Sequence, residues 1–409
     1  MDLKISTQEI RRGIRDYLAD HDCLADVRSI AEAGLSAHPP FDQAVWAGLA
    51  RDIGASALLV PEEHGGLGLG LRAMAGALAE CGHELYPGPL RATAAATAAL
   101  TAGLAAGPPA GPLAGPAAGS ARGGARPELA GALGAIAAQG AIASLAGPPA
   151  DARGSCGVTF DGTLLHGTAR AVPHGASASI VVVVASTALG ASLVLVQPPG
   201  LELAVRRPRA GIDFSTAYAD LVLDQVPGTV ISADPGQVAH ALDLAQLLTA
   251  AEQVGTAAGA LDRTLDYIKI REQFDRVIGG YQALQHRCAD VAVHIEAAAA
   301  LVERAGIAAE NADARLLSRL ALLARAAASQ VSLSAADTMV QLHGGIGFTW
   351  EHDAHFFFRR ARSTAAWFGT VPQLLAEAAR RDCLALIMPE LREADHARAE
   401  GVRAEPGSE

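Results

Sequence analysis

Apolar residues recur with helical spacing over the first third of the chain. The first stripe, with its members one helical turn apart, consists of Ile10, Ile14 and Leu18. Ser6 and Glu9 have the spacing of a capping box at the start of this helix. A second helix is expected to end near residues 50–52, and residues 71–106 again have an alanine-rich helical pattern. Residues 107–128 are dense in glycine and proline, which predicts a long loop between domains.

The middle third changes to the pattern of β-strands. Short runs of β-branched and apolar residues predict strands at 158–167, 178–186, 191–197, 201–205 and 219–226. Turns are expected at Asp161-Gly162 and at Pro198-Pro199-Gly200. Residues 179–198 have nearly the length of a membrane-spanning helix, but polar residues and Gly190 interrupt them. We interpret that stretch as two buried strands with a tight connection.

Helical spacing returns after Asp234. The longest stripe, interpreted as core packing, consists of Leu244, Leu247, Leu248, Ala251, Val254, Ala258 and Leu261. Two more long helices are expected at about 282–305 and 313–341, and a last one from Val371. The pattern predicts an α+β multidomain chain with a helical domain, a β domain and a second helical domain, at residues 1–128, 129–233 and 234–409.

Composition and charge exclude several classes of function. Half of the 409 residues are hydrophobic and 18% are charged, which excludes a disordered chain. The net charge of −11 argues against a nucleic-acid or anionic-membrane partner. The five cysteines form no CxxC pair, and the N-terminus has no apolar signal segment, so we expect a cytoplasmic protein without disulfides. His343, His352 and His355 lack the spacing of a zinc site, and we expect no metal.

Four segments carry a family resemblance. They are LLVPEEHGGLGLG (58–70), REQFDRVIGGYQALQH (271–286), QLHGGIGFTWEHD (341–353) and WFGT (367–370). In this order, on a helical–β–helical chain, they resemble the acyl-CoA dehydrogenase family of flavoproteins over nearly the whole sequence. The resemblance implies that family's fold, with a middle β-barrel or sandwich and a C-terminal four-helix bundle. It also implies FAD as cofactor, an acyl thioester of CoA or a carrier protein as substrate, and a separate electron acceptor.

The resemblance assigns a set of residues to the cofactor. The expected FAD-binding residues are Arg271, Gln273, Phe274, Gln282, Gln341, Gly344, Gly345 and Thr370. Arg271 offers a planar, charged fork for the pyrophosphate, and two glycines permit close backbone approach. Taken singly, Arg271 favours a surface ion pair with Glu272, and the two glycines favour a simple helix stop. In the family, the Arg271 and Gln341 positions reach into a neighbouring subunit's flavin site, which implies a dimer or tetramer.

The catalytic base of the family is missing. Family members abstract the α-proton of the thioester with a glutamate just before the Gly-Thr pair, and Phe368 stands there, 27 residues after Gln341. A second family position for the glutamate, 26 residues before Arg271, is Ala245. Glu252 lies two helical turns beyond it and is a candidate for a displaced base, or else for an ion pair.

The β domain also departs from the family. Residues 140–156 lack its Thr-Glu-Pro run, and the run whose threonine bonds near flavin N5 aligns with 171–174, where Pro173 has neither hydroxyl nor N–H. The residues that would contact the flavin of the same subunit are therefore eroded. The residues that would reach the flavin of a neighbouring subunit are preserved. This asymmetry favours one subunit of a heterotetramer with a homologous chain. A flavin-dependent monooxygenase on the same fold and a non-catalytic scaffolding subunit are the alternatives.

Overall fold

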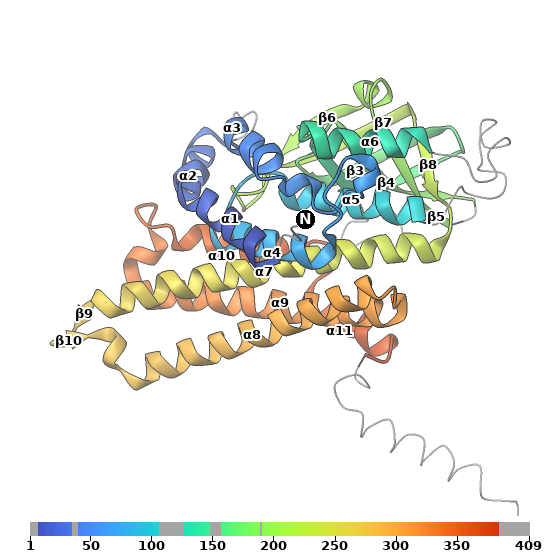
Figure 1. Ribbon diagram of the computed structural model, residues 1–409. Helices are drawn as coiled ribbons and strands as arrows, with labels where there is room; N and C mark the ends of the chain where they lie inside the picture. Colours follow the sequence, from blue (N-terminus) through green and yellow to red (C-terminus); the bar gives the residue numbers. More distant parts are fainter. Residues whose placement is uncertain (1–6, 35–39, 106–125, 148–156, 189, 384–409) are drawn as a thin grey trace, which may run out of the picture.

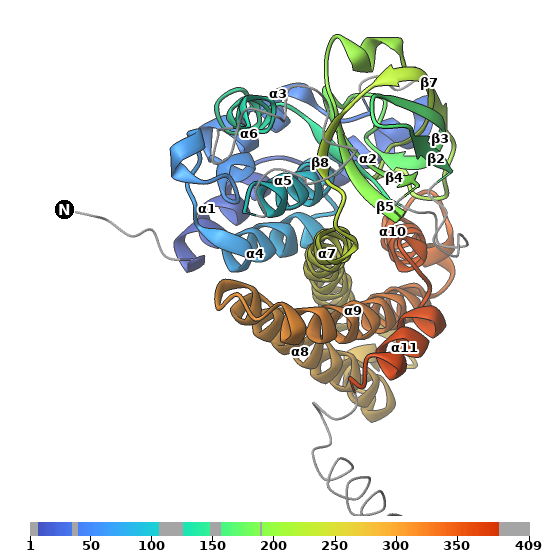
Figure 2. The ribbon, with the colours of Figure 1, turned by 90° about the vertical axis from the view of Figure 1, so that its right-hand side faces the viewer.

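A computed structural model describes residues 7–34, 40–105, 126–147, 157–188 and 190–383. Ser6 and most of the predicted loop 107–128 lie outside these residues. The N-terminal helices and the β domain lie side by side, and the C-terminal helices run beneath both (Figures 1 and 2). This helical–β–helical architecture confirms the predicted fold class. Among the described helices, none is long and apolar enough to cross a membrane.

Six α-helices lie among the described residues of the N-terminal part. They are α1 (Thr7–Ala19), α2 (Cys23–Ala33), α3 (Gln43–Ala47), α4 (Gly70–His83), α5 (Leu90–Ala105) and α6 (Pro127–Gln139). After α3 the chain makes a π-helical turn at Gly48–Asp52, where the second predicted helix ends. The proposed boundary between residues 128 and 129 falls inside α6, whose buried Leu133 and Ile136 share a core cluster with Leu100 of α5.

In the described part of the middle domain, eight strands form one mixed sheet. They are β1 (Ala143–Ala146), β2 (Val158–Phe160), β3 (Leu164–Pro173), β4 (Ile180–Thr187), β5 (Gly190–Val196), β6 (Val205–Arg209), β7 (Tyr218–Pro227) and β8 (Thr229–Ser232). The order is β6-β7-β3-β2-β4-β5-β8, and β1 adds to β4 in parallel. The two strands predicted within 179–198 are confirmed as the antiparallel pair β4 and β5.

One predicted strand is wrong. Residues Gly200–Leu203 form a short 3-10 helix, and β6 begins only at Val205. The chain turns back after the two prolines, because the N–H of Leu201 donates to the carbonyl of Gln197 (3.1 Å). β1 was not predicted, since its four residues are all buried and show no alternation of apolar and polar positions.

The C-terminal part is built on three long helices. It contains α7 (Pro235–Ile270), the two-residue strands β9 (Glu272–Gln273) and β10 (Arg276–Val277), α8 (Gln282–Glu310), α9 (Ala314–His343), α10 (Ala354–Ala366) and α11 (Val371–Arg380). Helix α10 was not predicted. Helix α7 also crosses α4 at very close range: a Cβ atom added at Gly255 would lie 1.9 Å from the carbonyl oxygen of Ala79. Small residues therefore join the N-terminal helices to the bundle.

Candidate functional site

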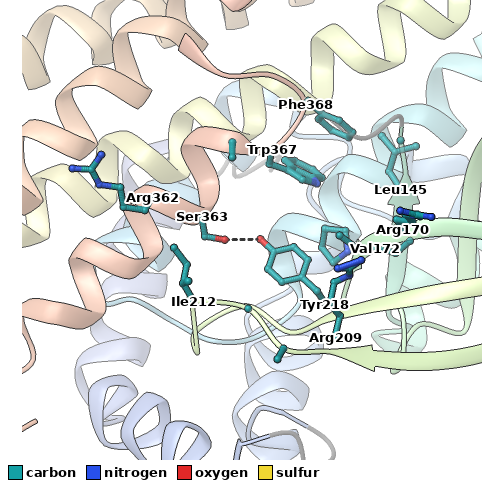
Figure 3. Close-up of a pocket in the computed structure, with 16 residues that line it drawn as sticks. Leu145, Arg170, Val172, Arg209, Ile212, Tyr218, Arg362, Ser363, Trp367 and Phe368 are labelled. Atoms are coloured by element: carbon teal, nitrogen blue, oxygen red, sulfur yellow. Dashed lines mark hydrogen bonds between the residues drawn. The ribbon is translucent and has the colours of Figure 1, made fainter. Parts of the chain in front are cut away.

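A cavity of about 360 Å³ lies between the β domain and the end of α10. Figure 3 shows its two walls: Leu145, Val172 and Tyr218 come from the β domain, and Ser363, Trp367 and Phe368 from the C-terminal helices and the turn after them. The Tyr218 hydroxyl and Ser363 Oγ join the walls through a hydrogen bond of 3.2 Å. Most of the lining is apolar, and we call this space the interdomain cavity.

Phe368, at one of the two positions predicted for the base, lies in this cavity. Phe368 is in the left-handed backbone region, at φ 59°, and its ring stacks on Trp367 with the ring centroids 3.9 Å apart. The Phe368 ring also fills the space beside Gly147, where an added Cβ would lie 2.1 Å from Cε1. Ala245 is fully buried in the core cluster against which Phe368 packs. The described residues that line the cavity include no aspartate or glutamate.

Glu252 lies in a buried ion cluster instead of the cavity lining. Its Oε2 is 2.7 Å from Arg91 Nε, and its Oε1 is 3.0 Å from Arg360 Nη1. Arg360 continues to Asp213, with Nε 3.3 Å from Oδ2. All four side chains are at most 6% exposed, and they come from α5, the loop before β7, α7 and α10. We call Arg91, Asp213, Glu252 and Arg360 the buried ion cluster; of the two roles weighed for Glu252, its contacts match the ion pair.

Two buried arginines hold the turn that carries Phe368. The Arg91 guanidinium lies over the Trp367 ring, 4.8 Å from the ring centroid. Arg325 is fully buried and donates to the Trp367 carbonyl (2.9 Å) and to that of Thr364, at the C-terminal end of α10. Burial lowers the pKa of Arg325 to about 9, while the negative end of the α10 dipole favours its charge. Sequence analysis missed Arg325, although an arginine within the buried stripe of α9 was the available signal.

His174 is buried behind the wall that Pro173 forms. Its side chain is 3% exposed, and burial, together with Arg91 and Arg360, lowers its pKa to about 3. Its Nδ1 has no hydrogen-bond partner among the described residues. The imidazole is therefore neutral at physiological pH.

The hairpin residues predicted to bind FAD lie at the far end of the bundle. Arg271, Gln273 and Phe274 occupy the exposed turn between α7 and α8, and Gln282 is the exposed first residue of α8. Phe274 is 86% exposed. Ala245 lies 26 residues before Arg271 on the continuous helix α7, which is roughly 39 Å along the axis. Figure 1 shows β9 and β10 projecting at that end. Arg271 therefore cannot reach the interdomain cavity of its own chain.

The remaining predicted cofactor residues also lie outside the cavity lining. Gln341 is exposed in the last turn of α9, followed by the exposed Gly344 and Gly345. A Cβ added at either glycine would meet nothing within 4 Å, so this surface is open to another molecule. Thr370 is the N-cap of α11, and its hydroxyl donates to Gln373 Oε1 (2.8 Å).

The chain is similar in sequence and in fold to known acyl-CoA dehydrogenases. The family model "Acyl-CoA dehydrogenase, C-terminal domain" matches residues 236–381. The chain is 34% identical to the acyl-CoA dehydrogenase IpdE2 of Mycobacterium tuberculosis, over 88% of this chain and 91% of that one. The structure of a variant of the Tcur3481-Tcur3483 steroid ACAD has a TM-score of 0.77 at 27% identity, covering 93% of this chain and 98% of that chain. The ChsE4-ChsE5 complex from Mycobacterium tuberculosis gives a TM-score of 0.75 at 24% identity, with the same coverage.

Proposed function

The chain belongs to the acyl-CoA dehydrogenase family of FAD-dependent oxidoreductases, and from this premise we propose that it is one subunit of a hetero-oligomer that desaturates an acyl thioester. The observation that carries the proposal is the cavity without a carboxylate among its described lining residues, with Phe368 and Ala245 at the two base positions. A general base typically contributes about 10²–10⁴-fold to the rate. A partner chain of a different kind supplies that base.

The β-domain wall of the interdomain cavity does not fit the isoalloxazine of FAD. The polar edge of that ring system needs hydrogen-bond donors, and Pro173 offers none. The N–H of Ala171 already donates to Asp220 (2.8 Å), and that of His174 to the carbonyl of Ala217 (2.7 Å). At these three positions the backbone therefore offers the isoalloxazine no free donor.

The residues at the other end of the chain do fit the cofactor. FAD, when bound, would supply the acceptor for the hydride from the β-carbon of the acyl group. Arg271 places a charged, exposed donor fork where a pyrophosphate in a neighbouring subunit can accept from it. The open backbone at Gly344 and Gly345 permits close approach of the same group. This chain therefore lends binding residues to a flavin that lies against its partner.

The comparisons support a two-chain assembly. The ChsE4-ChsE5 complex, which shares this fold, contains two differently named chains. We propose the same arrangement here, as a heterotetramer with a homologous chain. The substrate is an acyl thioester on CoA or a carrier protein, and a separate acceptor takes the electrons.

Co-expression with a homologous acyl-CoA dehydrogenase chain tests the proposal. We expect flavin absorbance in the co-purified complex and little in this chain alone. Arg271→Ala should weaken FAD binding by the complex roughly 10- to 100-fold, the value of a charge-assisted hydrogen bond. Lys269→Ala is the matched control, because it removes an exposed positive charge two residues earlier on the same helix.

Two outcomes would contradict the proposal. A flavin-loaded homomer of this chain that turns over acyl-CoA would show that no partner is needed. Absence of flavin from both the chain and the complex would support the scaffolding alternative.

A further inference from the structure

Three aromatic rings connect the two segments that the proposed function assigns to a neighbouring subunit's flavin. We infer that Tyr267, His343 and His352 are positioning residues, which hold the turn at Arg271 and the glycine loop at Gly344–Phe348 in one fixed arrangement. We call these three side chains the ring stack. The inference rests on the proposed function, because that function gives both segments the same cofactor to bind.

The three rings are in mutual contact. The centroids of the Tyr267 and His343 rings are 4.2 Å apart, with the ring planes inclined by only 24°. On its other side His343 meets His352, with the centroids 4.3 Å apart. His343, the middle ring, is 4% exposed. Packed rings are rigid and favourable contacts, so each of these side chains restricts the other two.

Tyr267 joins the ring stack to the turn at Arg271. It lies in the last turn of α7, and its carbonyl accepts the backbone N–H of Arg271 (2.9 Å). The carbonyl of Arg271 in turn accepts the N–H of Ile278 (2.8 Å), which closes the turn. Because the last turn of a helix frays unless something holds it, a fixed Tyr267 ring fixes the point from which Arg271 projects.

The two histidines join the ring stack to both ends of the glycine loop. His343 is the last residue of α9, and its Nδ1 lies 2.7 Å from the carbonyl oxygen of Met339. A carbonyl only accepts, so this nitrogen carries the proton. After the loop, Nδ1 of His352 accepts the N–H of Ala354, the first residue of α10 (3.1 Å). Contact between the two rings therefore closes the segment that contains the glycine loop.

The glycine loop packs closely on α9 along one side. A Cβ atom added at Gly347 would lie 2.9 Å from the carbonyl oxygen of Val340 and 3.1 Å from Cβ of His343. At Gly344 and Gly345 an added Cβ would meet nothing within 4 Å. The side that touches His343 is thus fixed by packing, while the open side faces another molecule.

Both imidazoles are neutral near pH 7. Burial lowers the pKa of His343, and the neighbouring His352 adds to this effect, although the bond to the Met339 carbonyl opposes it. Burial also lowers the pKa of His352, against the attraction of Asp353 and together with the repulsion of Arg28. The two rings therefore pack without charge repulsion.

Hydrogen–deuterium exchange of the purified full-length chain tests the inference without flavin or partner. Tyr267→Leu removes one ring and keeps an apolar side chain. We expect roughly two- to tenfold faster exchange at the amides of Arg271 and Ile278, the fold-change that loss of one aromatic contact gives. The amide of Thr349, which donates to the carbonyl of Ile346, should exchange faster by a similar factor.

The reverse change gives the sharper result. His352→Leu alters the far end of the ring stack, and we expect it to speed exchange at Arg271, with which His352 shares no hydrogen bond. Tyr267→Phe retains the ring and should exchange like the unmodified chain. His294→Ala is the matched control, because it removes an exposed histidine of α8 outside the ring stack.

FAD binding by the co-purified complex gives a second readout. Tyr267→Leu should weaken it roughly two- to tenfold, and Tyr267→Phe should restore it. In the Tyr267→Leu chain, Arg271→Ala should cost less affinity than it does in the unmodified chain, because the guanidinium is already displaced. A residue that only stabilised the fold would lower the Tm of the whole chain and leave the effect of Arg271→Ala unchanged.

Several outcomes would overturn the inference. They are unchanged exchange at Arg271 in His352→Leu, a Tyr267→Phe chain that behaves like Tyr267→Leu, and additive losses of FAD affinity on combining Tyr267→Leu with Arg271→Ala. Coupled exchange in a chain whose complex lacks flavin would support the coupling and contradict the proposed function. Uncoupled exchange in a chain whose complex binds flavin would do the reverse.

Discussion

Replacing Glu252 by glutamine separates its two roles. The change keeps the shape of the side chain but removes the carboxylate that contacts Arg91, which is 4% exposed. Arg360 keeps Asp213, whereas Arg91 is left as a buried cation without a contacting carboxylate among the described residues. Breaking a buried pair in this way costs about 3–5 kcal/mol.

That loss is large enough to measure by calorimetry. An unfolding entropy of roughly 0.9 kcal/mol/K for 409 residues converts it to a drop in Tm of about 4–6 °C. Asp266→Asn is the control on the same helix: its ion pair with Lys269 is 78% and 68% exposed, and we expect a change below about 1 kcal/mol.

The base hypothesis predicts the opposite pattern. If Glu252 took the α-proton, Glu252→Gln would lower turnover of the assembled enzyme about 10²–10⁴-fold with little effect on stability. An unchanged Tm together with such a loss of turnover would refute the ion-pair assignment. Loss of stability, with turnover normal in the fraction that remains folded, would support it.

Three further predictions concern stability, each measured by denaturant unfolding. Folded His174 has a pKa of about 3 against about 6.5 unfolded, so only the unfolded chain gains this proton as pH falls below 6.5. The free energy of unfolding therefore falls by up to about 1.4 kcal/mol for each pH unit below 6.5. His174→Asn should flatten the plot of this free energy against pH between pH 6.5 and 4.5. Gly255→Ala should destabilise by about 1–3 kcal/mol despite its better helix propensity, because its Cβ meets the Ala79 carbonyl at 1.9 Å. Gly147→Ala should cost a similar amount, roughly 1–3 kcal/mol, by displacing the ring of Phe368.

The order of helical and β segments was readable because it depends on local periodicity. The long helices α7, α8 and α9 begin within a few residues of where the apolar spacing predicts them. Helix α10 was missed because its charged residues conceal its buried face: Arg360, which is 1% exposed, looks like a surface residue in the sequence. Its burial depends on Glu252, 108 residues earlier, and local pattern carries no information on such a pairing.

Only those site positions that lie at a fixed number of residues from a recognisable motif could be predicted from the sequence. Counting from Gln341 leads to Phe368 and counting from Arg271 leads to Ala245, and the structure brings these two positions to one core cluster. The buried ion cluster could not be found in this way, because its four members come from four separate segments. Their pairing is a property of tertiary packing.

The positions of Phe368 and Ala245, reached by these two counts, are relevant to how the subunits assemble. Both counts lead to residues at one core cluster: Ala245 lies within it and Phe368 packs against it. Arg271 lies roughly 39 Å along α7 from Ala245, so on our proposal the residues around Arg271 and the chain's own cavity serve different sites. The described residues that line the cavity of each copy include no aspartate or glutamate. We therefore propose that a chain of another kind provides the base for the family's reaction.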